Sequence, residues 1–251
     1  MNNVYCVCTT PDMYPHYCDH WESFKESGRE LTFISDNTKD KTFSVGFTFN
    51  EDDLKTNLNF DVIPNNRHFW NCLGNRNIAW FFAHLRMLNF YLSYPNYDYY
   101  WFFDDDIRMS NWDKFFDGVN KDDSDFLSYF CFKKEDVVTQ KNIPNIDDKT
   151  FSKNLWFQRF PGEGDNLPTD VNEYFGSFFP TTRFSNKALK TLLEKNKMGY
   201  YGYHEGYVPT ILNYDKLKLN TIILPNNTSQ FFDVNEVNIT HKNIRITWEW
   251  L

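Results

Sequence analysis

YDYYWFFDDD, residues 97–106, is the stretch of sequence that decides the fold. Its first seven residues, Tyr97–Phe103, are almost all aromatic, and aromatic residues are enriched in β-strands. Asp104, Asp105 and Asp106 follow directly. A short strand without a polar face is typical of a sheet that is covered on both sides. The sequence therefore predicts an internal strand that ends in an acidic cluster.

Helices and strands alternate ahead of this stretch. From Arg76 to Ser93, apolar residues recur at about the 3.6-residue spacing of a helix, and Pro95 ends that pattern. Short apolar runs that are closed by loop residues predict earlier strands. Alternation of this kind favours an α/β fold with a largely parallel sheet, in which ligands bind at the carboxyl ends of the strands. The predicted earlier strands are Val4–Cys8, Leu31–Ser35 and Phe60–Ile63.

The second half of the chain continues the alternation. No flexible linker rich in Pro, Ser or Gly interrupts it, so we expect one domain spanning residues 1–251. Segment 133–170 predicts long loops with room for a hairpin, and segments 12–27 and 50–57 are helical or irregular. The remaining predicted elements are strands at Asp125–Phe132, Tyr174–Thr182 and Leu217–Leu224, and helices at Asn186–Asn196 and Glu205–Tyr214.

Composition excludes some classes of function. The net charge of −8 argues against a nucleic-acid binder, because phosphate neutralisation needs a basic surface. No stretch of about 20 apolar residues predicts a membrane span, and the first residues do not resemble a secretory signal. The five cysteines lack paired CxxC spacing, which indicates reduced thiols. We therefore expect a soluble, cytoplasmic protein.

The N-terminal cysteines leave two interpretations open. Cys6 and Cys8 lie two residues apart in an apolar run, so on a strand both side chains share one face and pack in the core. Alternatively, they form a zinc site with Cys18 and either His16 or His20.

The three aspartates repel one another, and a divalent cation would compensate their charge. Asp104 and Asp106 lie two residues apart, so in extended backbone both project the same way. Hard oxygen ligands favour Mg²⁺ or Mn²⁺, which would offset charge on a leaving diphosphate. The alternative is a solvated acidic turn, or an N-cap for a helix near Asn111–Phe116.

The segment YYWFFDDDIRMS resembles the aspartate-rich motif of GT-A glycosyltransferases, in which a hydrophobic strand ends in DxD or DDD. The resemblance implies a GT-A-like, Rossmann-related mixed sheet flanked by helices. It also implies that Asp104 and Asp105 contact the nucleotide-sugar donor, and that Asp104 and Asp106 hold Mn²⁺ or Mg²⁺. Residues 1–110 would then form the donor half and residues 111–251 the acceptor half.

A second segment is similar to the acceptor half of these enzymes. In EYFGSFFPTTRFSNKALKTLLEK and GYYGYHEGYVPTIL, a strand with Gly-Ser precedes a helix, and Glu205 opens the next helix. The resemblance implies that Glu205 is the base of an inverting transfer. A helix N-terminus stabilises the ionised carboxylate, so we expect a weak base that depends on positioning. His204 is a rival base or a surface histidine, and Glu205 is otherwise a helix cap.

Other residues take roles by the same resemblance. Late in the chain, His241 would ligate the metal and Lys242 would contact the diphosphate. Arg76, at the start of the helix before the motif, is the expected basic donor contact, whereas Arg86 is interpreted as a solvent-facing charge. Thr9, Thr10 and Asp36 follow strands that would border the nucleotide base and ribose.

The predicted function is transfer of a sugar from a nucleotide-diphosphate donor, of UDP or GDP type, to a glycan or glycolipid acceptor. Clustered aspartates also occur in metal-dependent phosphoesterases and nucleotidyltransferases, but these normally need further His and Asp ligands. A non-catalytic carbohydrate-binding protein is the third hypothesis, and it would be built of regularly spaced short strands.

Overall fold

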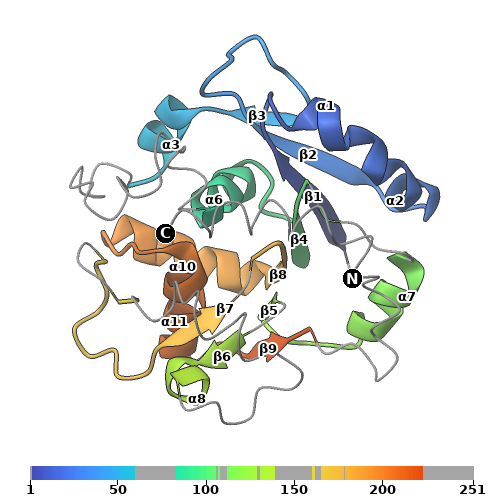
Figure 1. The fold of residues 1–251 in the computed structure, drawn as a ribbon. Coiled ribbons are helices and arrows are strands. Elements are labelled where there is room, and N and C mark those ends of the chain that lie inside the picture. Colours follow the sequence, from blue (N-terminus) through green and yellow to red (C-terminus); the bar gives the residue numbers. More distant parts are fainter. Residues whose placement is uncertain are drawn as a thin grey trace.

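The computed structural model describes residues 2–59, 83–105, 107, 112–128, 131–138, 160–161, 165–177 and 179–222. These residues form a mixed α/β structure with helices on both sides of a central sheet (Figure 1). In this part of the chain, no helix is long and apolar enough to cross a membrane.

The central sheet has seven strands in the order β3-β2-β1-β4-β8-β5-β9. The first four in this order are parallel to one another, β8 is antiparallel to both of its neighbours, and β5 is parallel to β9. The sheet order reverses at β1, which has β2 on one side and β4 on the other, and ligand sites of α/β sheets lie at such a reversal. The strands are β1 (Asn3–Thr9), β2 (Leu31–Asp36), β3 (Phe47–Phe49), β4 (Tyr99–Asp104), β5 (Phe126–Ser128), β8 (Thr181–Ser185) and β9 (Leu219–Thr221).

Strand β4 is buried on both faces, as its aromatic sequence predicts. Tyr100 and Phe102 belong to one hydrophobic core, and Trp101 and Phe103 belong to the other, because successive side chains of a strand point to opposite faces. The first core is closed by α3 (Glu51–Asn57), α6 (Ala83–Ser93), α10 (Asn186–Lys197) and α11 (His204–Tyr214). The second is closed by α1 (Tyr14–Tyr17), η1 (Cys18–Trp21), α2 (Glu22–Glu26) and α7 (Trp112–Val119).

Local sequence signals explain where two of the helices begin. Asn50 caps α3 by accepting hydrogen bonds from the Asp52 and Asp53 amides, and the Asp53 carboxylate accepts the Asn50 amide in return. The Ser185 hydroxyl caps α10 by accepting the Ala188 amide at 3.1 Å.

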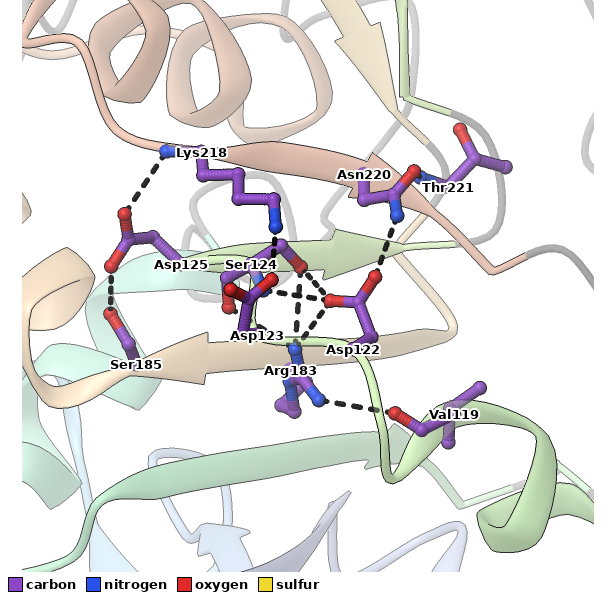
Figure 2. Close-up of polar contacts among 10 residues, drawn as sticks. All are labelled: Val119, Asp122, Asp123, Ser124, Asp125, Arg183, Ser185, Lys218, Asn220 and Thr221. Carbon is purple, nitrogen blue, oxygen red and sulfur yellow. Dashed lines mark hydrogen bonds and ion pairs between the residues drawn. The ribbon is translucent and has the colours of Figure 1, made fainter.

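A polar network joins β8, β5 and β9 at the edge of the sheet where β5 and β9 begin (Figure 2). Arg183 on β8 is only 3% exposed, and its guanidinium donates to the Asp122 carboxylate at 2.8 Å and to the Ser124 carbonyl at 3.1 Å. Asn220 also donates to Asp122, at 2.6 Å. The Arg183 guanidinium lies over the Tyr99 ring, 4.5 Å from its centroid. This network fixes the turn that leads into β5.

The sequence predicted the mixed α/β class correctly, but two predicted strands are wrong. Residues 125–132 divide into β5 of the main sheet and β6 (Cys131–Lys133), and residues 174–182 divide into β7 (Phe175–Ser177) and β8. Strands β6 and β7 pair with each other in a separate two-stranded sheet. Pro180 has no amide hydrogen to continue a ladder, which explains the second division.

The remaining differences are local. Segment 12–27 is helical over most of its length, segment 50–57 contains α3, and the predicted loop segment 133–170 begins with the short helix α8 (Lys134–Val138). Strand β3 has only three residues and was not predicted. The predicted strand Phe60–Ile63 and the first part of the helix predicted from Arg76 lie outside the described residues.

Candidate functional site

Polar side chains gather where the parallel strands β1, β2 and β4 end. Thr9 is the last residue of β1, Asp36 of β2 and Asp104 of β4. The register places Cys8 opposite Asp104 and Thr9 opposite Ser35, so these strand ends are neighbours. This edge lies at the reversal of the sheet order, the place where the sequence predicted the donor to bind.

Arg86 from α6 lies at the centre of this edge. Its guanidinium donates to Asp104 Oδ1 at 2.9 Å, and the residue is only 8% exposed. Burial lowers the pKa of Arg86, but the charges of Cys8, Asp104, Asp105 and Asp36 outweigh burial and hold it above its usual value. The interpretation of Arg86 as a solvent-facing charge is therefore wrong. Periodicity missed it because α6 is buried on every side from Ala83 to Tyr91.

Asp104 has a carboxylate that Arg86 compensates in part. Burial raises its pKa, and the Arg86 charge and hydrogen bond oppose that rise without cancelling it. The side chain remains 37% exposed, so the carboxylate is accessible from solvent beside its bond to Arg86. Asp104 therefore accepts a hydrogen bond from Arg86 and also remains accessible from solvent.

Asp105 turns to the other side of the sheet edge. Its carboxylate accepts the Thr9 hydroxyl at 2.6 Å, and its carbonyl accepts the Trp21 indole N–H at 2.9 Å. Burial raises its pKa to about 6, with the charge of Asp104 adding to the rise and the Thr9 hydrogen bond opposing it. These contacts tie β4 to β1 across the reversal of the sheet order.

The loops after β1 and β2 are shaped by Thr10 and Asp36. The Thr10 carbonyl accepts the amides of Met13 and Tyr14, which starts α1. The Asp36 carboxylate, in a residue only 5% exposed, accepts the Thr38 amide at 3.0 Å, and its charge acts on Arg86. Asp36 therefore lies close enough to the arginine to share the charge balance of the site.

Glu205 lies in the first turn of α11, near enough to Asp104 for the charge of that aspartate to contribute to its raised pKa. Its carboxylate accepts the Tyr203 hydroxyl at 2.8 Å and the Phe179 amide. Burial raises the pKa to about 8, although both hydrogen bonds lower it. The expectation that the helix N-terminus would keep Glu205 readily ionised is wrong, because loss of hydration in the buried site outweighs the helix dipole.

His204, the rival base, is buried. Its ring contacts Phe179 and Tyr203, with centroid distances of 4.6 and 4.7 Å, and it is 7% exposed. The interpretation as a surface histidine is therefore wrong. A second imidazole, His84 on α6, is also buried, and burial together with the charge of His204 lowers its pKa to about 3. His84 is therefore neutral at physiological pH.

Four predicted site residues, Arg76, Asp106, His241 and Lys242, lie outside the described residues. Among the residues that the structure does describe, no three His, Cys, Asp or Glu side chains are grouped to hold a metal ion. Cys6 and Cys8 are buried in the core, where loss of hydration raises the pKa of both thiols. This favours the core interpretation of these cysteines over the zinc alternative.

One carboxylate at the sheet edge could take part in one kind of metal site. Mg²⁺ is commonly held by one or two carboxylates and completes its coordination with water and substrate phosphates. Asp104 supplies one accessible carboxylate of that kind, although its Oδ1 also accepts a hydrogen bond from Arg86. Neither a model of a known protein family nor a curated protein matches this chain.

Proposed function

We propose that this chain is a metal-dependent glycosyltransferase that moves a sugar from a nucleotide-diphosphate donor to a hydroxyl acceptor with inversion. One observation carries the proposal: Asp104, partly exposed at the end of β4, lies near enough to the buried Glu205, distant in sequence, for its charge to contribute to the raised pKa of that glutamate. Ionisable groups with shifted pKa values at a ligand-binding edge are typical of catalytic sites.

Four residues form the donor side in this proposal. Asp104 contacts the donor, Arg86 keeps the Asp104 carboxylate oriented, and Asp105 with Thr9 holds the two strand ends together. A bound Mn²⁺ or Mg²⁺ would offset the charge that develops on the leaving diphosphate. Arg76, Asp106, His241 and Lys242 keep the roles that the sequence predicts for them.

Glu205 carries the chemistry on the acceptor side. Its carboxylate takes the proton of the acceptor hydroxyl while that oxygen forms the new bond to the anomeric carbon. The bond between the anomeric carbon and the diphosphate oxygen breaks, and the nucleoside diphosphate leaves with the bonding electrons. A single displacement of this kind inverts the anomeric centre. Because only ionised Glu205 accepts a proton, kcat/KM should rise with pH toward a pKa of about 8 in the free enzyme.

The donor site is tested by thermal melting with UDP-, GDP-, dTDP- and CMP-sugars, each with and without Mn²⁺. A ligand that binds only the folded state raises the melting temperature. We expect one nucleotide to give a shift that requires metal and is lost in Asp104→Asn. Asp113→Asn is the matched control, because that exposed carboxylate pairs with Arg29 away from the site.

Other outcomes would assign the site differently. Absence of any shift, together with hydrolysis of a simple phosphodiester, would replace the proposal with a phosphoesterase. Sugar binding that needs Ca²⁺ and no nucleotide would replace it with a carbohydrate-binding protein.

The base is tested by Glu205→Gln. We expect turnover to fall by about 10²- to 10⁴-fold, the usual contribution of general acid–base catalysis, while the metal-dependent melting shift remains. Product NMR should show an inverted anomeric centre. Retained configuration, or turnover like that of the wild type in Glu205→Gln, would remove Glu205 from the mechanism.

A further inference from the structure

The first turn of α11 is held in place from several directions. The Asp165 carboxylate accepts the Tyr203 amide at 3.0 Å, and the Ser177 hydroxyl donates to the Glu205 carbonyl at 3.2 Å. A Cβ atom at Gly206 would overlap the Phe160 ring, so only glycine allows this approach. The backbone that carries Tyr203 and Glu205 is therefore fixed before any ligand binds.

The Glu205 side chain is fixed as well. Tyr203 lies at the N-cap position of α11 and donates its hydroxyl to Glu205 Oε2 at 2.8 Å, and the Phe179 amide is the second donor. Tyr203 is 7% exposed, and its ring packs against His204. A carboxylate can accept about four hydrogen bonds. Two protein donors therefore orient the group and leave acceptor capacity for a substrate hydroxyl.

We propose that Tyr203 is a positioning residue for Glu205. The Tyr203 hydroxyl holds Oε2 of Glu205, so that the carboxylate keeps one orientation toward the acceptor. This inference rests on the proposed role of Glu205 as base. The tyrosine acts through the carboxylate and takes no proton from the substrate. Its hydrogen bond also favours the ionised form of a group that burial would otherwise keep protonated.

Tyr203→Phe removes the hydroxyl and keeps the ring that packs against His204. A hydrogen bond to a charged group is worth enough to change kcat by about tenfold. We expect that fall in kcat with an unchanged KM for the donor. The pH dependence of kcat/KM should move to higher pH, because the ionised form of Glu205 loses a donor. An unchanged pH profile would overturn the proposal.

Tyr207→Phe is the matched control. Tyr207 is a buried tyrosine of the same helix, and its hydroxyl donates to the Tyr200 carbonyl at 3.0 Å rather than to Glu205. We expect this variant to keep the wild-type pH profile. An equal pH shift in both variants would reduce Tyr203 to a structural residue.

A double variant tests whether Tyr203 acts through Glu205. In a Glu205→Gln background, Tyr203→Phe should cause little further loss of kcat, because the residue that it positions is already inactive. Losses that multiply would contradict the proposed coupling. If Tyr203→Phe does not fold, Asp165→Ala loosens the Tyr203 backbone instead and should shift the profile in the same direction by less.

A measurement without turnover separates this inference from the proposed function. Carboxyl ¹³C NMR of glutamate-labelled protein follows the pKa of Glu205, whose signal is identified by its absence in Glu205→Gln. A higher pKa of Glu205 in Tyr203→Phe supports the positioning contact even if no sugar donor reacts. Absence of reaction with every sugar donor would defeat the glycosyltransferase proposal but not this contact. An unchanged pKa would overturn the positioning role even in an active enzyme.

Discussion

The two ends of the central sheet use the same pair of residue types to opposite effect. At the edge where β1, β2 and β4 end, which we call the ligand edge for its proposed role, the Arg86 guanidinium lies 2.9 Å from the Asp104 carboxylate. At the opposite edge, the Arg183 guanidinium lies 2.8 Å from the Asp122 carboxylate. Both arginines are buried. The aspartates differ, since Asp104 is 37% exposed at its side chain and Asp122 only 17%.

The pKa values of the carboxylates move in opposite directions at the two edges. Burial raises the pKa of Asp122, but hydrogen bonds from Ser124 and Asn220 and the Arg183 charge outweigh burial, and the pKa falls below its usual value. At the ligand edge, burial raises the pKa of Asp104, Asp105 and Glu205, and their partners do not compensate it.

The difference separates a closed charge network from the carboxyl groups that we propose to be functional. The charge of the Asp122 carboxylate is compensated within the protein by Arg183 and by the hydrogen bond from Asn220 (Figure 2). We therefore expect this network to stabilise the fold. At the other edge, burial outweighs the hydrogen bonds and the Arg86 charge, so the carboxyl groups keep raised pKa values. Two ion pairs of nearly equal length thus differ in the pKa of their carboxyl group, because the surrounding hydrogen-bond donors and the degree of burial differ.

Arg183→Leu should give the largest effect, because it breaks the closed network. Removing one partner of a buried ion pair typically costs about 3–5 kcal/mol, since the other charge stays buried. Urea unfolding measures the loss. Lys218→Met is the control, because its pair with Asp123 is exposed, and we expect little change. Equal stability of the two variants would show that the Arg183 network does not stabilise the fold.

Glu205 should make the stability of the wild type fall as the pH rises. Its pKa is about 8 when folded and 4.5 ordinarily, so between these values the folded chain holds a proton that the unfolded chain has released. The free energy of unfolding of Glu205→Gln, relative to that of the wild type, should increase by about 1.4 kcal/mol per pH unit across that window. Unfolding of both proteins from pH 5 to 8 tests this, and parallel curves would show that Glu205 is not buried as described.

Asp122 should behave in the opposite way. Its folded pKa is lowered, so it contributes stability above its ordinary pKa of 3.8 and loses that contribution as the pH falls through the folded value. Asp122→Asn should cost about 2 kcal/mol at pH 7, because hydrogen bonds to a charged group are lost. The difference from the wild type should shrink below about pH 4. A difference that stays constant with pH would contradict the proposed charge compensation.

Thr9→Val should give the smallest effect. It removes the hydroxyl that donates to Asp105 and leaves a buried carboxylate with one donor fewer, at a cost of about 1 kcal/mol. The pKa of Asp105, now about 6, should rise further, because Thr9 opposes the effect of burial. Unfolding and carboxyl NMR measure the two changes, and a lower pKa of Asp105 would show that the hydrogen bond does not form.

Local pattern predicted the elements whose signals are strong within a short window. Strands β1, β2 and β4 and helices α10 and α11 begin and end within about two residues of the predicted positions. The predicted strands were wrong where one apolar run contributes to two different sheets. Strands β5 and β8 belong to the central sheet, whereas β6 and β7 form the second sheet, and such pairing depends on partners that are distant in sequence.

The candidate site divides in the same way. Asp104, Asp105 and Glu205 could be named from sequence, because aspartates after an aromatic strand and a glutamate at a helix start are local features. Arg86 could not be assigned, since a helix that is buried all round gives no preferred face, and Tyr203 carried no signal at all.

The sequence by itself determined an α/β sheet with an acidic strand end, because aromatic periodicity and the composition of short segments act locally. Only the tertiary structure decided the state of each charge. It raised the pKa of Glu205 against its helix dipole, paired Arg86 with Asp104, and closed the Arg183 network, because burial and hydrogen-bond donors come from segments that lie far apart along the chain.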